Sequence, residues 1–270
     1  MRGTALAILI VGLCGFCPAQ KVRFSPANKS EVLQRAKNIP TSDQERARQL
    51  TEWFREAGCK GNLLSEQKVE GSEFPNIVCR MKGKADEKII VGAHYDRASS
   101  AQRPFDNWSG ALLLPSLYQC LRTRRRRHTV IFVAFADHGD QPTGAEAFLN
   151  QLSPAELKGA KAMINLDALG LSPTKVWSDH SDKDLVQALM TMVYAIKIPA
   201  SQIDAARAGR SDSDPFLARQ IPQITIHSLT QANLKGGKAT PFEASSFYDS
   251  YRLICGFIAY LDENHKLGTR

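Results

Sequence analysis

The chain has 270 residues, of which 43% are hydrophobic and 23% charged, with a formal net charge of +8. This composition is that of an ordinary soluble globular protein, and the sequence contains no repeats, low-complexity tracts or obvious linkers. The basic excess invites a nucleic-acid or membrane function, but the basic residues are spread along the chain except for one dense run, residues 122–127. That run lies between an apolar segment and a strand-like segment. We therefore interpret it as a solvated helix end and expect no nucleic-acid partner.

The N-terminus has the pattern of a secretory signal peptide. Arg2 precedes an apolar run, and Ala19 ends a small-residue site before polar sequence begins. The pattern predicts cleavage after residues 1–19 and a single mature domain over residues 20–270. The apolar run is too short for a good transmembrane helix, so we expect no membrane span after cleavage. We favour a secreted or periplasmic protein over a lipid-anchored one.

Four cysteines remain after that cleavage: Cys59, Cys79, Cys120 and Cys255. An oxidising compartment would allow a bridge between Cys59 and Cys79, which would tie the exit of a helix to a nearby strand. Four buried free thiols are the alternative, and the sequence does not decide between the two.

The apolar periodicity divides the chain into alternating helices and strands. In chain order we expect helices over residues 41–57, 111–121, 145–151, 184–196 and 246–264, and strands over residues 67–69, 76–80, 89–93, 129–135, 161–166 and 221–226. This alternation predicts one α/β domain with a mainly parallel sheet. Pro115 should kink the helix over residues 111–121 or mark its first turn.

Acidic residues and histidines concentrate where the predicted strands end. The residues concerned are His94, Asp96, Asp137, His138, Asp140, Asp167, Asp212, Asp214 and His227. A single aspartate at such a position is usually a helix cap, and a single histidine is usually a satisfied surface group. Because several strand ends behave alike, we expect a clustered polar site at the carboxyl edge of the sheet.

Four motifs occur in the order known from one enzyme family. They are GAHYD at residues 92–96, DNWSG at 106–110, INLDALG at 164–170 and SDSDPF at 211–216. In this the chain resembles the zinc aminopeptidases of metallopeptidase family 28, which include bacterial leucyl aminopeptidases and the glutaminyl cyclases. The resemblance implies a three-layer α/β/α sandwich with a mixed, mainly parallel central sheet. It also implies two zinc ions bridged by one aspartate.

Matched residue by residue, the resemblance makes His94 and Asp167 ligands of the first zinc and Asp106 the bridging aspartate. Asp96 corresponds to the carboxylate that orients the histidine. The chemistry agrees, because two carboxylates and one imidazole leave a fourth position open for water, as in catalytic zinc sites. Such a zinc brings the pKa of its water close to neutrality. Asp96 could accept the second N–H of the His94 ring.

Family members carry two consecutive glutamates after the strand that corresponds to residues 129–135. The first glutamate is the general base and the second binds the other zinc. This chain has neither glutamate at that place. Counting from Phe135 places His138 as the base and Gly139 at the ligand position. Counting back from Gly144 places Asp137 as the base and His138 as the ligand. The sequence leaves both alignments open.

A second departure affects the family's His-Thr-Pro motif, because Ala239 stands where the histidine ligand of the second zinc should be. We therefore expect one Zn²⁺ rather than two. His227 could substitute from a neighbouring strand end, but a histidine at such a position usually packs or caps.

We favour a secreted zinc-dependent hydrolase, an aminopeptidase-type exopeptidase acting on a peptide or small amide. The alternative is a catalytically inactive relative that serves as a binding or interaction protein. A third candidate is an acyltransferase of the glutaminyl-cyclase type, but those enzymes use the zinc site that is degraded here.

Overall fold

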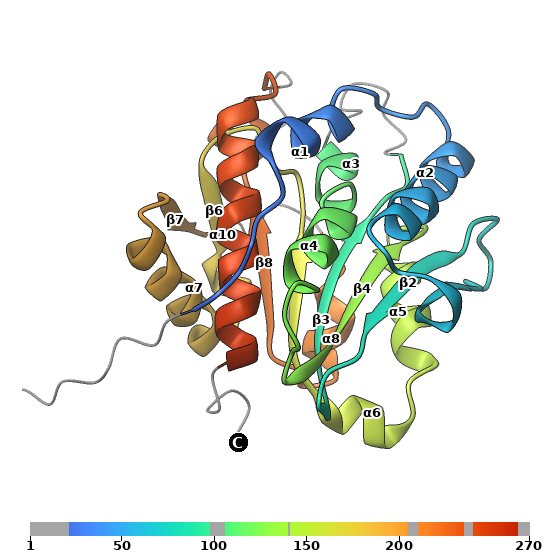
Figure 1. Cartoon of the computed structure of the whole chain (residues 1–270). Helices are drawn as coiled ribbons and strands as arrows, with labels where there is room; N and C mark the ends of the chain where they lie inside the picture. Colours follow the sequence, from blue (N-terminus) through green and yellow to red (C-terminus); the bar gives the residue numbers. More distant parts are fainter. Residues whose placement is uncertain (1–21, 98–105, 140, 205–209, 235–239, 264–270) are drawn as a thin grey trace, which may run out of the picture.

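The computed structural model describes residues 22–97, 106–139, 141–204, 210–234 and 240–263 (Figure 1). The signal peptide expected over residues 1–19 therefore lies outside the described residues. Eight strands form one sheet in the order β1-β2-β4-β3-β5-β8-β6-β7. The strands are β1 Leu64–Gln67, β2 Asn76–Met81, β3 Ala85–His94, β4 His128–Phe135, β5 Ala160–Leu166, β6 Thr174–Trp177, β7 Ala200–Ile203 and β8 Gln223–His227.

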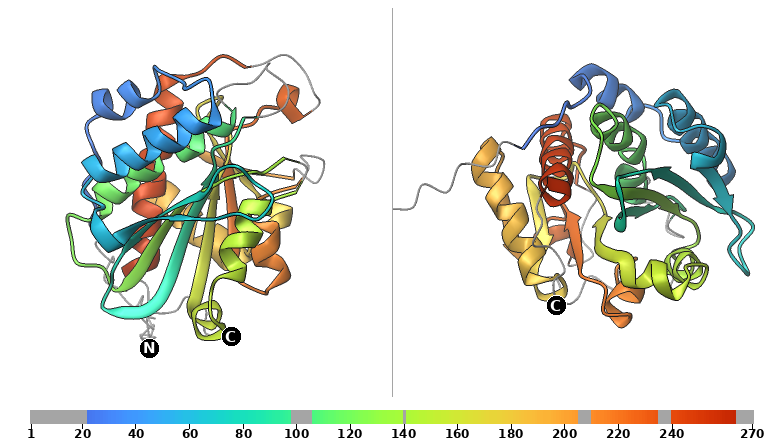
Figure 2. Two further views of the ribbon diagram at one scale, coloured as in Figure 1. Left: turned by 90° about the vertical axis from the view of Figure 1, so that its right-hand side faces the viewer. Right: turned by 60° about the horizontal axis from the view of Figure 1, so that its bottom comes forward.

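Helices cover both faces of this sheet, as Figure 2 shows. They are α1 Lys29–Arg35, α2 Asp43–Glu56, α3 Asp106–Ala111, α4 Leu114–Leu121, α5 Thr143–Asn150, α6 Pro154–Gly159, α7 Lys183–Ile196, α8 Asp214–Ala218, α9 Gln231–Leu234 and α10 Ala244–Glu263. Helices α1 to α4, α7 and α10 pack on one apolar face, and α5, α6 and α8 pack on the other. The protein is a three-layer α/β/α sandwich, as expected.

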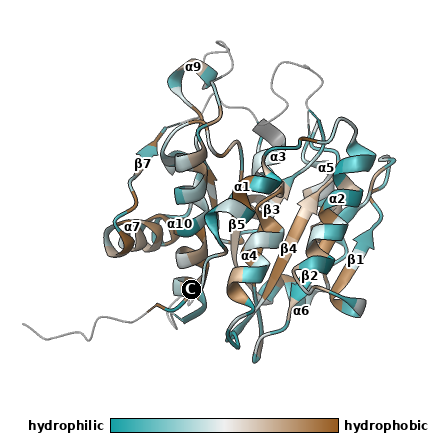
Figure 3. Ribbon diagram, turned by 45° about the horizontal axis from the view of Figure 1, so that its top comes forward, coloured by the Kyte–Doolittle hydropathy of each residue, from teal (hydrophilic) through white to brown (hydrophobic). Residues whose placement is uncertain are grey.

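The central strands β3 and β4 are buried on both faces, which explains their nearly continuous apolar sequence (Figure 3). Successive side chains of a strand point to opposite faces. Val91 accordingly joins the core under α4 and α10, whereas its neighbour Ile90 joins the core under α5 and α8. The inner strands β4, β3, β5 and β8 run parallel, and β1, β2 and β6 add antiparallel pairings at the edges. The sheet is thus mixed and mainly parallel.

Most of the expected elements are confirmed, with differences at the sheet edges. The first predicted strand lies at Leu64–Gln67 instead of residues 67–69. The predicted helix over residues 111–121 is two helices, α3 and α4, and Pro115 stands in the first turn of α4, where its missing N–H costs no helical hydrogen bond. Strands β6 and β7, of four residues each, were not predicted.

A disulfide joins Cys59 to Cys79, with 6.3 Å between the two Cα atoms. It links the segment after α2 to β2, and so decides between the two alternatives for these cysteines. Cys120 and Cys255 are free and buried. Among the described residues, no helix combines the length and the apolar character needed to cross a membrane.

Candidate metal centre and active site

The candidate site lies where the carboxyl ends of the central parallel strands meet. His94 ends β3 and is paired in register with Phe135, the last residue of β4. Strand β5 runs parallel on the other side of β3 and is followed at once by Asp167. Because these three strands run in the same direction, the residues that follow them are delivered to one edge of the sheet.

His94 is held between two carboxylates. Its Nδ1 lies 3.1 Å from Asp96 Oδ1, and its Nε2 lies 3.9 Å from Asp167 Oδ1. The His94 ring is buried, whereas the Asp167 side chain keeps about a third of its surface exposed, at 31%. The hydrogen bond to Asp96 engages Nδ1 and leaves Nε2 directed toward Asp167, which is the arrangement that a metal-binding histidine needs.

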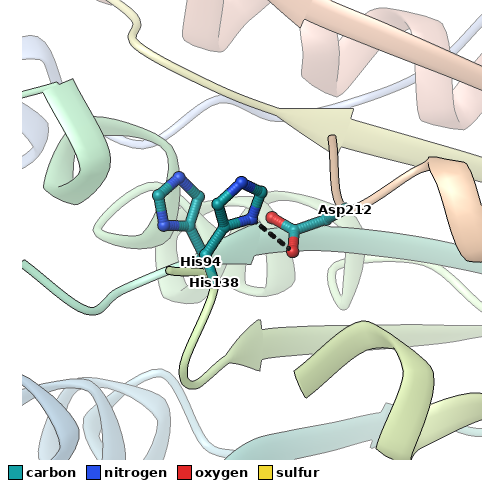
Figure 4. Close-up of side chains that lie close together, drawn as sticks. All are labelled: His94, His138 and Asp212. Carbon is teal, nitrogen blue, oxygen red and sulfur yellow. Dashed lines mark hydrogen bonds and ion pairs between the residues drawn. The ribbon is translucent and has the colours of Figure 1, made fainter. Parts of the chain in front are cut away.

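His138 lies against His94 and belongs to a second histidine–aspartate pair. The two imidazole rings stack with their centroids 4.4 Å apart. The Nδ1 of His138 lies 3.1 Å from Asp212 Oδ1, as the dashed line in Figure 4 marks. The Asp212 side chain is 1% exposed, and its other oxygen, Oδ2, has no hydrogen-bond partner within the described part of the chain. A buried carboxylate oxygen without a partner is costly, so this position calls for a cation or a donor.

The loop after β4 directs His138 into the site through an unusual backbone conformation. Asp137 has a φ of +53° and Gly139 a φ of +42°, so the chain reverses on both sides of His138. The backbone N–H of His138 also donates to the Asp96 carboxylate, which ties this loop to the end of β3. Asp137 is half-buried and makes no hydrogen bond or ion pair among the described residues. The loop conformation therefore directs His138 inward.

The carboxylates create a strongly negative local field. Burial alone would lower the pKa of His138, but Asp212, Asp167 and Asp96 outweigh it and raise that pKa to about 9. In the same way Asp96 and Asp212 raise the pKa of His94 against the effect of burial. Burial raises the pKa of Asp167, whereas the bond from His94 lowers the pKa of Asp96 against the effect of burial. A field that favours protonated imidazoles also favours a bound metal cation.

The residues present fit a zinc ion. Ligand atoms of His94, His138 and Asp212 all lie within 4.8 Å of one another. The 3.9 Å between His94 Nε2 and Asp167 Oδ1 is less than the sum of two zinc–ligand bonds, about 4.1 Å. Imidazole and carboxylate ligands in a partly open site are typical of catalytic zinc. The chemistry suits zinc, but the cluster that meets this spacing is His94, His138 and Asp212, whereas the sequence predicted His94, Asp106 and Asp167 as the ligands.

Three further residues that the sequence suggested for the site are Asp106, Asp140 and His227. Asp106 begins α3 beside the end of β3, but its side chain lies outside what the structure describes, as does Asp140. His227 does not join the group formed by His94, His138 and Asp212. Its Nδ1 accepts the Leu229 N–H, and its Nε2 is buried without a partner in the described residues.

Sequence reasoning noted Asp212 as a strand-end acid but gave it no role. The structure pairs it with His138, from which it is separated by 74 positions along the chain. The SDSDPF motif was the available signal, since it places Asp212 directly before the first turn of α8.

Comparisons with known proteins identify the family and the fold. The model of peptidase family M28 matches residues 76–251, well over half of the chain. The aminopeptidase YwaD of Bacillus subtilis is 24% identical over 163 residues, which cover 57% of this chain and 32% of that protein. The chain thus spans about a third of the length of that curated relative.

Solved structures share the fold. The LapA aminopeptidase of Legionella pneumophila superposes with a TM-score of 0.70 at 15% identity, covering 91% of this chain and 78% of that one. A glutaminyl cyclase from an Acidobacteriales bacterium gives a TM-score of 0.69 at 16% identity, covering 91% and 98%. The order of the strands, the residues gathered at their carboxyl edge and the family match lead to one conclusion: this chain belongs to peptidase family M28.

Proposed function

We propose that this protein is a secreted zinc-dependent hydrolase of the aminopeptidase type, which uses one zinc ion and acts on a peptide or small amide with a free amino end. We further propose that the signal peptide ends at Ala19 and that residues 20–270 form the mature domain. The observation that carries the proposal is the pairing of His138 with the buried Asp212, with the His138 ring stacked on His94. It supplies a titratable group, with a carboxylate to orient it, beside a histidine suited to bind metal.

His94 and Asp167 would hold the zinc, with Asp106 as the third ligand by its place in the DNWSG motif. Zinc bound there would supply a Lewis acid and a water of lowered pKa. Asp96 would keep the His94 ring in the orientation and tautomer that present Nε2 to the metal. The exposed third of the Asp167 side chain indicates the side from which a substrate would approach.

His138 is our candidate for the general base, in preference to Asp137. Its Nδ1 is engaged by Asp212, so its Nε2 is the nitrogen left to accept a proton. A pKa of about 9 would keep the ring protonated near neutral pH, but zinc held by His94 would lower that pKa by repelling the positive charge of the protonated ring. Asp137 is half-buried like His138, but it has no orienting partner among the described residues.

A catalytically inactive relative is the second candidate. In one of the two alignments of this loop, Gly139, which is exposed and has no side chain, stands where the family has a carboxylate ligand. A binding protein derived from this family would retain the sandwich and a single metal. The third candidate, a glutaminyl-cyclase-like acyltransferase, is supported by the overlap with 98% of the bacterial cyclase.

The first experiment is to measure zinc in the purified protein by elemental analysis. We expect one zinc per chain, and its absence would leave only the fold-related binding protein. The second is to assay amino-acid arylamides, peptides and an N-terminal glutaminyl peptide with the wild type and with His138→Ala and Asp137→Ala. His180→Ala serves as a control, because His180 lies at the amino end of β8, away from the site.

If His138 is the base, His138→Ala loses at least about 100-fold in kcat and keeps its zinc, whereas Asp137→Ala stays close to the wild type. Loss of zinc together with activity in His138→Ala would instead make His138 a ligand. Full activity in both variants would remove both candidate bases. Turnover of the glutaminyl peptide alone would favour the cyclase.

A further inference from the structure

A basic pocket lies at the opposite edge of the sheet from the candidate active site. Its volume is about 800 Å³, and its basic lining residues are Arg23, Lys84, Arg124, Arg125, Arg126 and Arg127. Strands β3 and β4 begin here, and α10 ends here, toward the bottom of Figure 1. The ten residues of β3 separate this pocket from His94, a distance of about 30 Å. The pocket is therefore independent of the zinc site.

One of the two carboxylates in the pocket is already used by the fold. Asp262 is buried and accepts the backbone N–H groups of His128 at 2.7 Å and Arg127 at 3.2 Å. These bonds fasten the end of α10 to the start of β4. Glu263 is the other acidic residue of the lining. Among the described lining residues six basic side chains thus face two acidic ones, which gives this part of the pocket a net positive charge.

Arg126 provides the specific feature of this pocket. It is 2% exposed, its Nε donates to the Leu121 carbonyl at 2.8 Å, and its Nη1 lies 3.8 Å from Asp262 Oδ2. Its Nη2 is buried and has no hydrogen-bond partner among the described residues. Buried guanidinium N–H groups are normally satisfied, so an unpartnered one in a basic pocket indicates that an acceptor belongs there.

This result refines the view of residues 122–127 as a solvated helix end. Arg124 and Arg125 are exposed, as that view requires, but Arg126 is buried in the wall of the pocket. Exposed arginines around a buried one can close on a multiply charged anion, because each guanidinium offers a planar set of donors that matches phosphate oxygens.

We propose that this pocket binds a phosphate-bearing anion with at least two charged phosphate groups, one of them bound by Arg126. Free diphosphates and the phosphate headgroups of lipids share this chemistry. None of the described lining residues is aromatic, so this part of the pocket offers no ring on which a nucleic-acid base could stack. A diphosphate would offer the acceptor that Arg126 Nη2 lacks and would offset the positive charge of the exposed arginines.

The test is calorimetric titration of the full mature protein with inorganic pyrophosphate at low salt. The variant is Arg124→Glu/Arg125→Glu, which changes only exposed side chains. The matched control is Lys37→Glu/Lys60→Glu, which makes the same change in net charge at exposed positions outside the pocket. We expect pyrophosphate to bind the wild type and the control alike and to bind the pocket variant at least about tenfold more weakly, because each lost hydrogen bond to a charged group contributes that much.

Co-sedimentation with phosphatidylcholine vesicles, with and without phosphatidic acid, distinguishes the two sources. Sedimentation that requires phosphatidic acid and is lost in the pocket variant identifies a lipid headgroup, and binding of pyrophosphate alone identifies a free phosphate. The proposal is overturned if the wild type binds neither probe, or if the control weakens binding as much as the pocket variant. Pyrophosphate that binds at the zinc instead of in the pocket would also be recognised, because its binding would be unchanged in the pocket variant.

Discussion

The His138 ring lies flat against the His94 ring, with 4.4 Å between their centroids and 27° between their planes. Each ring has its own carboxylate partner at 3.1 Å, Asp96 for His94 and Asp212 for His138. The candidate site is thus built from two adjacent histidine–aspartate pairs. One pair suits metal binding and the other suits proton transfer, and this division of roles underlies the first prediction.

Asp212→Asn is expected to lower kcat about 10- to 100-fold while the zinc content stays the same. The amide cannot provide the charge that holds the His138 imidazole in place, although it keeps the shape of the buried side chain. Steady-state kinetics and zinc analysis on the same preparations check this. The control is Asp214→Asn, since Asp214 contacts the Ser211 N–H and not His138. Equal losses in the two variants would contradict a specific role for Asp212.

Gly110→Ala is expected to destabilise the protein by about 1–3 kcal/mol. A Cβ at Gly110 would lie 2.3 Å from the Leu166 carbonyl oxygen, so α3 would have to move away from the end of β5. Urea unfolding measures the loss. Gly159→Ala is the control, because its Cβ would meet nothing closer than 3.7 Å. Since Asp167 follows Leu166 directly, zinc affinity should fall in Gly110→Ala and stay constant in Gly159→Ala.

Removal of the disulfide by Cys59→Ala/Cys79→Ala should cost about 3 kcal/mol of unfolding free energy. The bridge closes a loop with a sequence separation of 20, which restricts the unfolded chain. Denaturation with and without dithiothreitol checks this. The reductant should lower the stability of the wild type to that of the double variant and leave the variant unchanged. If dithiothreitol destabilises the variant by a similar amount, the loss of stability does not come from the Cys59–Cys79 disulfide.

His227 should make the protein less stable in mild acid. Burial, with a smaller effect of Lys175, lowers the His227 pKa to about 4 in the folded protein, whereas an unfolded histidine titrates near 6.5. Between these values the unfolded state binds more protons. Stability therefore falls as pH decreases from about 6.5 toward 4, and above 6.5 this group has no effect.

Between about pH 7.5 and pH 5 the His227 contribution is about 2 kcal/mol. Urea unfolding at both values should show a loss in the wild type that is larger by this amount than in His227→Gln, which stays neutral throughout. The same acid sensitivity in both proteins would mean that the His227 ring is not buried in its neutral form.

The sequence by itself determined the alternation of helices and strands and the residues that end the central strands. These features are local. Apolar residues with a period of two indicate a strand, and those with a period near 3.6 indicate a helix. Asp96 lies beside His94 because it follows only two positions later, just beyond the end of the strand. The motifs around His94, Asp106 and Asp167 were enough to indicate the family and its metal.

Only the tertiary structure decided which side chains lie together where the chain departs from the family pattern. The sequence left open whether His138 or Asp137 enters the site, because the outcome depends on a left-handed backbone at Asp137 and Gly139 that no local periodicity indicates. Asp212 and the unpartnered group of Arg126 became visible only when distant segments were packed together. Partners of buried charges are set by long-range contacts, and such contacts leave no regular spacing in a single sequence.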